Sequence, residues 1–188
     1  ARILRSLSVA APPGPNSLGS LSGTVSVAGL LHDPASLEVA QRIDFKKPLK
    51  APDEVLRLRG PFTHEVVTSD GSHRLINVSP ESPDFIEVTE VPALFIRTLL
   101  IAEDAAFFGH PGIDLTEMPR AIATNIARGG AVRGASTITQ QLAKNLFLTR
   151  EKSLQRKLRE LSYAFLLESG LGKIRILEIY LNIIEWGP

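Results

Sequence analysis

The chain has 188 residues and no cysteine, so it has neither a disulfide framework nor thiolate chemistry, and cysteine usage leaves its compartment open. The formal net charge is only +1, which argues against an overall field that attracts nucleic acid. No run approaches the roughly 20 apolar residues that cross a bilayer, and the apolar stretch after Arg5 is too short for a signal peptide. Length and composition therefore predict one globular domain with a real core and room for an extension.

The first 60 residues give little indication of a packed domain. Residues 10–29 are rich in Pro, Gly and Ser and show neither a helical nor a strand period, so we interpret residues 1–60 as a linker or a poorly ordered segment. The chain starts at Ala1 and stops directly after a helical pattern, which is typical of a fragment of a longer protein.

Residues 61–87 are predicted to contain a β-hairpin. Two strand-like runs, 62–69 and 72–78, flank the pair Asp70-Gly71, which favours a two-residue turn. His64 and His73 fall on these strands, but no further ligands at zinc-like spacing accompany them, so we expect no metal there.

A mostly apolar helix is predicted to follow Pro92 and to carry two carboxylates, Glu103 and Asp104, near its end. Burial disfavours the charged form of a carboxylate and can make a glutamate a useful general base or acid. Glu103 is therefore the first catalytic candidate. The structural alternative is that both acids only terminate a core helix and pair with arginines.

Residues 134–145 place hydroxyls, amides and a lysine on an amphipathic helix. Ile138, Leu142 and Leu146 recur every four residues and mark the core face, whereas Thr137, Gln141 and Lys144 share another face. The helix can be capped by Ser136 or Thr137. A helix N-terminus favours anions, so the cap and Lys144 could hold a phosphate or pyrophosphate. A capped surface helix without a ligand is the alternative.

Basic charge is concentrated between Ala131 and Glu160, where seven Lys or Arg stand against two Glu. The next helix is predicted to bury a stripe formed by Leu154, Leu158, Leu161 and Phe165, and to align Lys152, Arg156 and Glu160 at four-residue steps. The last helix is predicted to bury Ile174, Leu177, Leu181 and Ile184.

Four segments, at 103–114, 134–145, 156–160 and 173–182, resemble in this order the motifs of the peptidoglycan glycosyltransferases. This family comprises monofunctional transglycosylases, which the ending 183–188 resembles more closely, and the glycosyltransferase domain of bifunctional penicillin-binding proteins. The resemblance runs from about Val88 to Pro188. It implies a mainly α, lysozyme-like domain at 88–188 that is incomplete at its C-terminal end, preceded by the small β-hairpin segment at 61–87.

The resemblance also implies roles for individual residues. Glu103 matches the family's catalytic base and Glu160 its second essential acid. The positions that match substrate-binding residues are Ser136, Thr137, Gln140, Gln141, Lys144, Asn145, Lys152, Arg156 and Lys157. The supporting positions are Asp104, Phe107, His110, Gly112, Asp114, Gly134, Glu178 and Asn182. Lys152 departs from many relatives, which have arginine there, so the charge is kept but the bidentate fork is lost.

The implied activity is inverting transfer that polymerises lipid II into β-1,4-linked glycan strands and releases polyprenyl pyrophosphate. The implied partners are lipid II, the growing glycan strand and the membrane surface, with cell-wall synthesis proteins as further candidates and no nucleic acid. No metal site or certain cofactor is expected, although a divalent cation, Mg²⁺ or Mn²⁺, could assist the leaving group. The implied location is the outer, periplasmic face of the bacterial cytoplasmic membrane, with the anchor outside this fragment.

Two other functions stay open from the residues. Two glutamates beside a sugar bond also describe a lysozyme-like peptidoglycan hydrolase, although a hydrolase of uncharged links has little use for a basic leaving-group site. The second alternative is a noncatalytic module that binds an anionic lipid or glycan.

Overall fold

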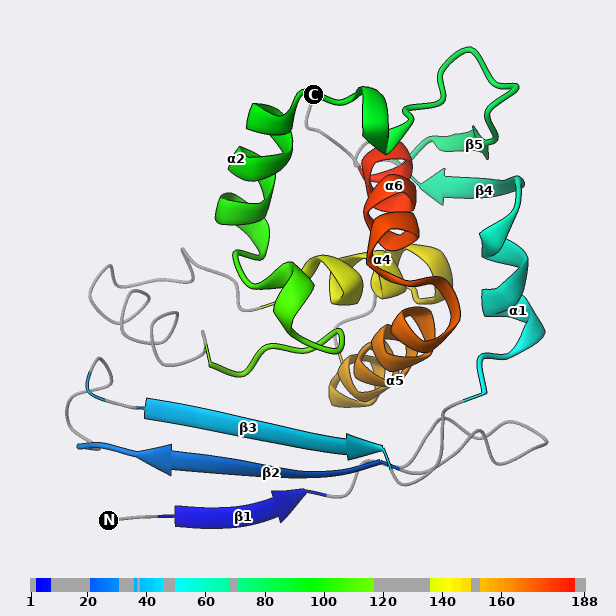
Figure 1. Cartoon of the computed structure of the whole chain (residues 1–188). Helices are drawn as coiled ribbons and strands as arrows, with labels where there is room; N and C mark the ends of the chain where they lie inside the picture. The colour runs from blue at the N-terminus through cyan, green and yellow to red at the C-terminus, as the bar shows by residue number, and fades with distance from the viewer. Residues whose placement is uncertain are drawn as a thin grey trace. The chain divides into compact units, whose positions relative to one another are not determined.

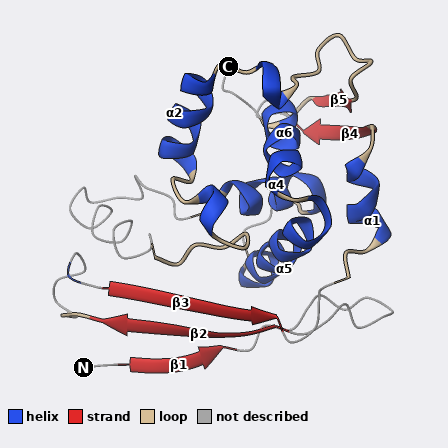
Figure 2. Cartoon of the chain, in the orientation of Figure 1, coloured by secondary structure: helices blue, strands red, loops and turns tan. Residues whose placement is uncertain are grey.

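The computed structural model describes residues 3–7, 21–30, 36, 38–45, 50–67, 71–116, 136–149 and 153–184. Its strands are β1 (Ile3–Leu7), β2 (Leu21–Ala28), β3 (Glu38–Phe45), β4 (Phe62–Val67) and β5 (His73–Val78). Its α-helices are α1 (Asp53–Leu56), α2 (Ala93–Glu103), α4 (Ile138–Phe147), α5 (Leu154–Leu171) and α6 (Lys173–Ile183) (Figures 1 and 2). The 3-10 helices whose bounds fall within the described residues are η2 (Arg57–Arg59), η3 (Val88–Glu90) and η4 (Phe107–Gly109).

The chain divides into two compact units, which are residues 1–49 with 114–136 and residues 50–113 with 137–188. All the described α-helices belong to the second unit, so the predicted mainly α fold class is confirmed. Residues 50–60 were predicted to belong to the N-terminal linker, but they fall in the helical unit. Arg59 explains part of this, because its Nε donates a 2.7 Å hydrogen bond to the Gly170 carbonyl of α5.

The first unit contains a three-stranded antiparallel sheet in the order β1-β2-β3. Ile3 pairs with Val27, and Leu21 pairs with Phe45. The interpretation of residues 1–60 as a linker or poorly ordered segment is therefore wrong for these strands. Composition misled this interpretation, because the prolines of residues 10–29 all lie before Leu21, whereas residues 21–28 alternate small polar and aliphatic side chains, a pattern that suits a strand.

The predicted hairpin is confirmed as β4 and β5, which pair from Phe62 opposite Val78 to Val67 opposite His73. The predicted turn at Asp70-Gly71 begins at Asp70, which lies outside the described residues. Phe62 and Val78 are buried in this register, and β5 and η3 contact α6, so the hairpin belongs to the helical unit.

The core of the helical unit lies among α4, α5 and α6. Its fully buried side chains include Ile138 and Leu142 of α4, Leu166 and Leu167 of α5, and Ile176 and Ile179 of α6. At the other end of α4, the ring of Phe147 stacks on Tyr163 of α5 with centroids 4.4 Å apart. This packing fixes the directions in which α4, α5 and α6 present their polar residues.

The predicted buried stripes of α5 and α6 are only partly right. Phe165 and Leu177 are buried, but Leu158 is 47% exposed and Ile174 is 58% exposed. Each helix contacts more than one neighbour, since α5 packs against α1, α4 and α6. Its buried side is therefore wider than one four-residue stripe, and Leu158 falls outside it.

Helix α2 was predicted as an apolar helix, and its core-helix alternative is wrong. Leu99 is its buried residue, whereas Leu94 is 75% and Ile101 is 76% exposed. Pro92 precedes the helix as its N-terminal flanking residue, and Glu103 is its last residue.

Candidate functional site

The two neighbouring carboxylates at the end of α2 have opposite environments. Glu103 is exposed, whereas Asp104 is only 7% exposed. Asp104 leaves the helical path, with φ −164° and ψ 77°, and this turns its side chain inward. The expectation that burial activates Glu103 is therefore corrected, because the buried acid is Asp104.

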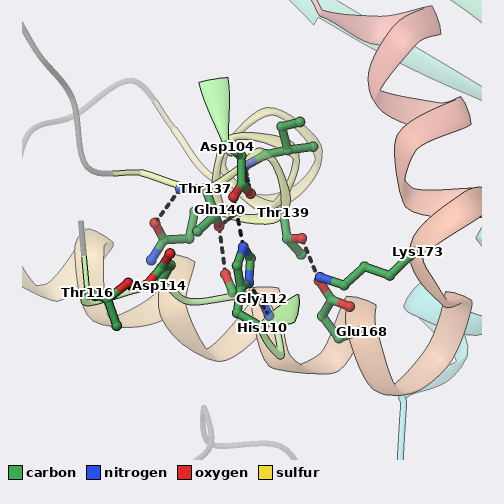
Figure 3. A network of polar contacts seen from close by, with 11 residues as sticks. Asp104, His110, Gly112, Asp114, Thr116, Thr137, Thr139, Gln140, Glu168 and Lys173 are labelled. Carbon is green, nitrogen blue, oxygen red and sulfur yellow. Dashed lines mark hydrogen bonds and ion pairs between the residues drawn. The ribbon is translucent and has the colours of Figure 1, made fainter. Parts of the chain in front are cut away.

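Asp104 organises a buried network at the start of α4 (Figure 3). His110 donates from Nε2 to Asp104 Oδ1 over 2.8 Å, and the backbone N–H of Ile138 donates to Asp104 Oδ2 over 3.0 Å. The Gly112 N–H donates to His110 Nδ1, so Nδ1 must be the unprotonated nitrogen and Nε2 must carry the proton. One carboxylate thus fixes both the His110 ring and the first turn of α4.

The predicted cap of α4 is confirmed as Thr137, which forms a capping box with Gln140. The Thr137 hydroxyl also donates to the Gly112 carbonyl over 2.6 Å, and both side chains are buried. Their polar groups are hydrogen-bonded inside the protein, and their predicted contact with substrate stays a prediction. At this helix N-terminus the Asp104 carboxylate accepts the Ile138 N–H, so the protein supplies a negative charge where the sequence predicted an external anion.

Glu103 is held by a different helix residue. The Gln141 side chain donates from Nε2 to Glu103 Oε2 over 2.8 Å, and the Tyr180 hydroxyl of α6 donates to Gln141 Oε1 over 3.1 Å. Burial raises the pKa of Tyr180, and the nearby Glu103 and Asp104 carboxylates raise it further. Sequence reasoning missed Tyr180, although it lies in the segment 173–182 that carries the family resemblance.

The second candidate acid, Glu160 on α5, is 3% exposed. Arg156 donates from Nη1 to Glu160 Oε2 over 3.0 Å, and Lys157 donates from Nζ to Glu160 Oε1. The predicted alignment of Arg156 and Glu160 is thus confirmed as an ion pair. The Arg156 Nε is buried and has no hydrogen-bond partner within the part of the chain that the structure describes.

A third cluster of contacting side chains is centred on Glu168 and joins residues of η4, α4, α5 and α6. Glu168 Oε1 accepts hydrogen bonds from the Thr139 hydroxyl over 2.6 Å and from Lys173 Nζ over 2.7 Å (Figure 3). Lys173 Nζ also lies 4.4 Å from the centroid of the buried Phe107 ring. Phe107 therefore makes a cation–π contact with Lys173 beside this group, and its predicted supporting role in the site stays a prediction.

Two of the remaining supporting positions, Asn182 and Asp114, form hydrogen bonds with loop residues. Asn182 on α6 donates from Nδ2 to the Ile86 carbonyl over 2.9 Å and accepts the Ile86 N–H at Oδ1 over 2.8 Å. Glu178 pairs with Arg175 on the same helix. Asp114 Oδ1 accepts both the backbone N–H and the hydroxyl of Thr116.

The C-terminal part of α4 carries two further predicted binding residues. Lys144 is exposed, so its ammonium group is accessible to a ligand. Asn145 is held through its carbonyl, which accepts a 3.1 Å hydrogen bond from Nε2 of His64 on β4. His64 therefore caps the end of α4. Ser136 is half-buried, and the predicted site residues Gly134 and Lys152 lie outside the described residues.

We predict that His64 makes stability depend on pH. Burial is the largest effect on His64 and lowers its pKa below the ordinary value of 6.5. The unfolded chain therefore takes up a proton first, so this contribution to stability is complete above pH 6.5 and is lost as the pH falls toward the lowered pKa.

In His64→Gln, an amide can still donate to the Asn145 carbonyl without titrating. The variant should lose less stability than wild type between roughly pH 7.5 and pH 5.5, measured by urea unfolding. Equal pH dependence in wild type and His64→Gln would contradict this prediction.

Within the described ranges, no group of three or more His, Asp or Glu side chains is arranged to hold a metal ion. Among the described helices, none combines the length and apolar character needed to span a membrane.

Comparison with known proteins gives a consistent class. The family model described as Transglycosylase matches residues 72–188. A biosynthetic peptidoglycan transglycosylase from Cupriavidus metallidurans is 47% identical over 108 residues, which cover 57% of this chain and 46% of the relative. One from Alcanivorax borkumensis is 41% identical over 134 residues, which cover 71% of this chain and 54% of the relative. Penicillin-binding protein 1B of Buchnera aphidicola is 43% identical over 111 residues, covering 58% and 15%.

The matched region contains the Glu103, Glu160 and Asp104 groups described above. Since the family model matches more than half of the chain, the chain belongs to the transglycosylase family. The chain spans about half the length of the first two of these relatives.

Proposed function

We propose that the chain carries a peptidoglycan glycosyltransferase activity that polymerises lipid II into β-1,4-linked glycan strands. The observation that carries this proposal is the exposed Glu103 carboxylate, held at one oxygen by Gln141 inside the region matched by the family model. Among the described residues, Gln141 is the only donor to this carboxylate, so Oε1 can accept a proton from a substrate.

In the proposed reaction, Glu103 removes the proton of the acceptor's GlcNAc 4-hydroxyl as that oxygen attacks C1 of the donor's MurNAc. Attack opposite the lipid pyrophosphate inverts the anomeric carbon and gives the β-1,4 link. The C1–oxygen bond to the pyrophosphate breaks, and its electron pair leaves with polyprenyl pyrophosphate. No covalent bond to the protein is formed.

Cations on α4 and α5 suit the charge that develops on the leaving pyrophosphate. Lys144 is exposed, and Arg156 has a buried Nε without a hydrogen-bond partner in the described part of the chain. We assign Lys144, Arg156, Lys157 and Lys152 to this role. Glu160 would act by fixing Arg156 and Lys157 rather than by transferring a proton, because its two oxygens already accept from them.

The donor set near Glu160 does not fit a divalent cation. Both carboxylate oxygens of Glu160 face positively charged side chains, which would repel Mg²⁺ or Mn²⁺. The proposed reaction therefore includes no step through a metal ion.

The proposed substrate is a lipid-linked disaccharide, and the proposed place of work is the outer face of a bacterial cytoplasmic membrane. Growing glycan strands and other cell-wall synthesis proteins are the further partners that this role implies. The hydrolase and binding-module alternatives are less favoured, because neither requires both a held base and a cluster of cations.

The test is polymerisation of fluorescent lipid II in detergent by the full-length protein. Glu103→Gln should lower the rate by about 100-fold or more, because it removes a general base. Glu90→Gln, at an exposed glutamate of η3, should keep the wild-type rate. Unchanged activity in Glu103→Gln would remove Glu103 from the role of base. Strand cleavage without polymerisation would favour the hydrolase, and binding without either reaction would favour the binding module.

A further inference from the structure

Gln141 links the side chains of Tyr180 and Glu103 through one polar chain. Tyr180 donates to Gln141 Oε1 over 3.1 Å, and Gln141 Nε2 donates to Glu103 Oε2 over 2.8 Å. Tyr180 lies on α6, Gln141 on α4 and Glu103 at the end of α2. Three helices far apart in sequence therefore meet at one carboxylate.

This polar chain has a single consistent direction. An ionised carboxylate only accepts hydrogen bonds, so Gln141 must present its NH₂ group to Glu103 and its oxygen to Tyr180. The Tyr180 hydroxyl must then donate. Burial, followed by the nearby carboxylates, raises the pKa of Tyr180, which keeps that proton in place at physiological pH.

We propose that Tyr180 is a positioning residue that acts through Gln141. It fixes the Gln141 amide so that Glu103 is held at Oε2 and presents Oε1 to the acceptor hydroxyl. This role rests on the proposed function, and it extends the catalytic apparatus from the base to a buried tyrosine on the last helix.

The exposure of Glu103 gives this role a physical reason. A glutamate side chain at a helix end samples several rotamers, and each misplaced rotamer withdraws the base from the reacting hydroxyl. Tyr180 is 3% exposed and is held by packing. Its fixed hydroxyl can therefore restrict the rotation of the Gln141 amide, which in turn restricts the Glu103 side chain. Without the hydroxyl, the Gln141 amide can rotate and release Glu103.

The proposal predicts a specific kinetic change in Tyr180→Phe, which removes one oxygen and keeps the buried ring. The kcat for lipid II polymerisation should fall by about tenfold, the effect of one ordering hydrogen bond, while KM stays near the wild-type value. A loss of folded protein alone would not lower kcat in a variant that unfolds at the same temperature as wild type.

Tyr163→Phe is the matched control. The Tyr163 hydroxyl also donates to a glutamate, Glu54 Oε1, and its ring also packs against a neighbouring helix. It has no contact with Glu103 or Gln141 among the hydrogen bonds of the described residues. The control should therefore keep the wild-type kcat and KM, and thermal unfolding of both variants confirms that each is folded.

A double-mutant cycle tests whether Tyr180 acts through Gln141. Gln141→Met keeps the length of the side chain and removes both polar groups, so it should lower kcat at least as much as Tyr180→Phe. Adding Tyr180→Phe to Gln141→Met should then cause no further loss. Multiplicative losses in the double variant would overturn the mechanism through Gln141, and an unchanged kcat in Tyr180→Phe would overturn the positioning role itself.

The assay separates this proposal from the proposed function. Active wild type with inactive Glu103→Gln supports the function, and the Tyr180→Phe result then decides the positioning role alone. A folded full-length wild type that does not polymerise lipid II would overturn both.

Discussion

Replacing Asp104 by asparagine is expected to lower the free energy of unfolding by about 3 kcal/mol. Asp104 accepts hydrogen bonds from His110 Nε2–H and from the Ile138 N–H, and both contacts are buried. An asparagine has one accepting oxygen, so its NH₂ group must face one of these donors. If the His110 ring changed its tautomer, the conflict would move to the Gly112 N–H. The cost is an unsatisfied buried donor together with the lost negative charge at the start of α4.

Urea unfolding followed by far-ultraviolet circular dichroism measures this change. The neighbouring Glu103→Gln is the matched control, because it makes the same chemical change at an exposed residue. Its free energy of unfolding should stay within about 0.5 kcal/mol of wild type. A stability of Asp104→Asn equal to that of Glu103→Gln would show that the buried network does not stabilise the fold.

The different environments of the neighbouring residues Glu103 and Asp104 could be predicted only in part from the sequence. The sequence predicts that Glu103 and Asp104 end an apolar helix, and the structure confirms that position. It cannot predict which acid turns inward, because this depends on the backbone of a single residue after the helix. Asp104 has φ −164°, and a helical value there would have pointed its side chain elsewhere.

Helix α4 shows both the strength and the weakness of local patterns. The prediction of the Thr137 cap is confirmed, and the capping box follows from its spacing to Gln140. The helix N-terminus was expected to attract an external anion, yet Asp104 supplies one from 34 residues earlier in the chain. A sequence pattern confined to one helix cannot predict a contact with a residue so distant in the chain.

The same reason explains why Tyr180 was missed as a partner of Glu103. Tyr180 and Gln141 are separated by 39 residues, and their contact depends on how α4 and α6 pack. The family resemblance identifies the segments but not the bonds between them. The error at Leu158 has a related cause, because the buried side of α5 is set by several neighbours rather than by its own period.

Replacing Gly112 by alanine is expected to destabilise the helical unit by about 3 kcal/mol. Gly112 has φ +95°, a left-handed value that is energetically unfavourable for any residue with a Cβ atom. An added Cβ would lie 3.0 Å from Glu168 Cγ and 3.1 Å from the Ala164 carbonyl oxygen. The Ala164 oxygen belongs to the backbone of α5, so it cannot move without disturbing the helix. Since the Gly112 carbonyl accepts from Thr137, displacement of this loop would also disturb the start of α4.

Alanine substitutions at Gly71 and Gly109 are controls that distinguish the cost of the left-handed backbone from the cost of the contact with α5. Gly71 has φ +84° but nothing within 4 Å of an added Cβ, so Gly71→Ala pays only the cost of the left-handed backbone, about 1 kcal/mol. Gly109→Ala has neither difficulty and should remain within about 0.5 kcal/mol of wild type. Equal losses in Gly112→Ala and Gly71→Ala, measured by urea unfolding, would mean that α5 gives way and that contact with it does not fix the loop. The expected larger loss at Gly112 would instead show that the loop from His110 to Gly112 is held rigidly against α5. Because this loop contacts both Asp104 and Thr137, its rigidity fixes the position of α4 relative to the end of α2.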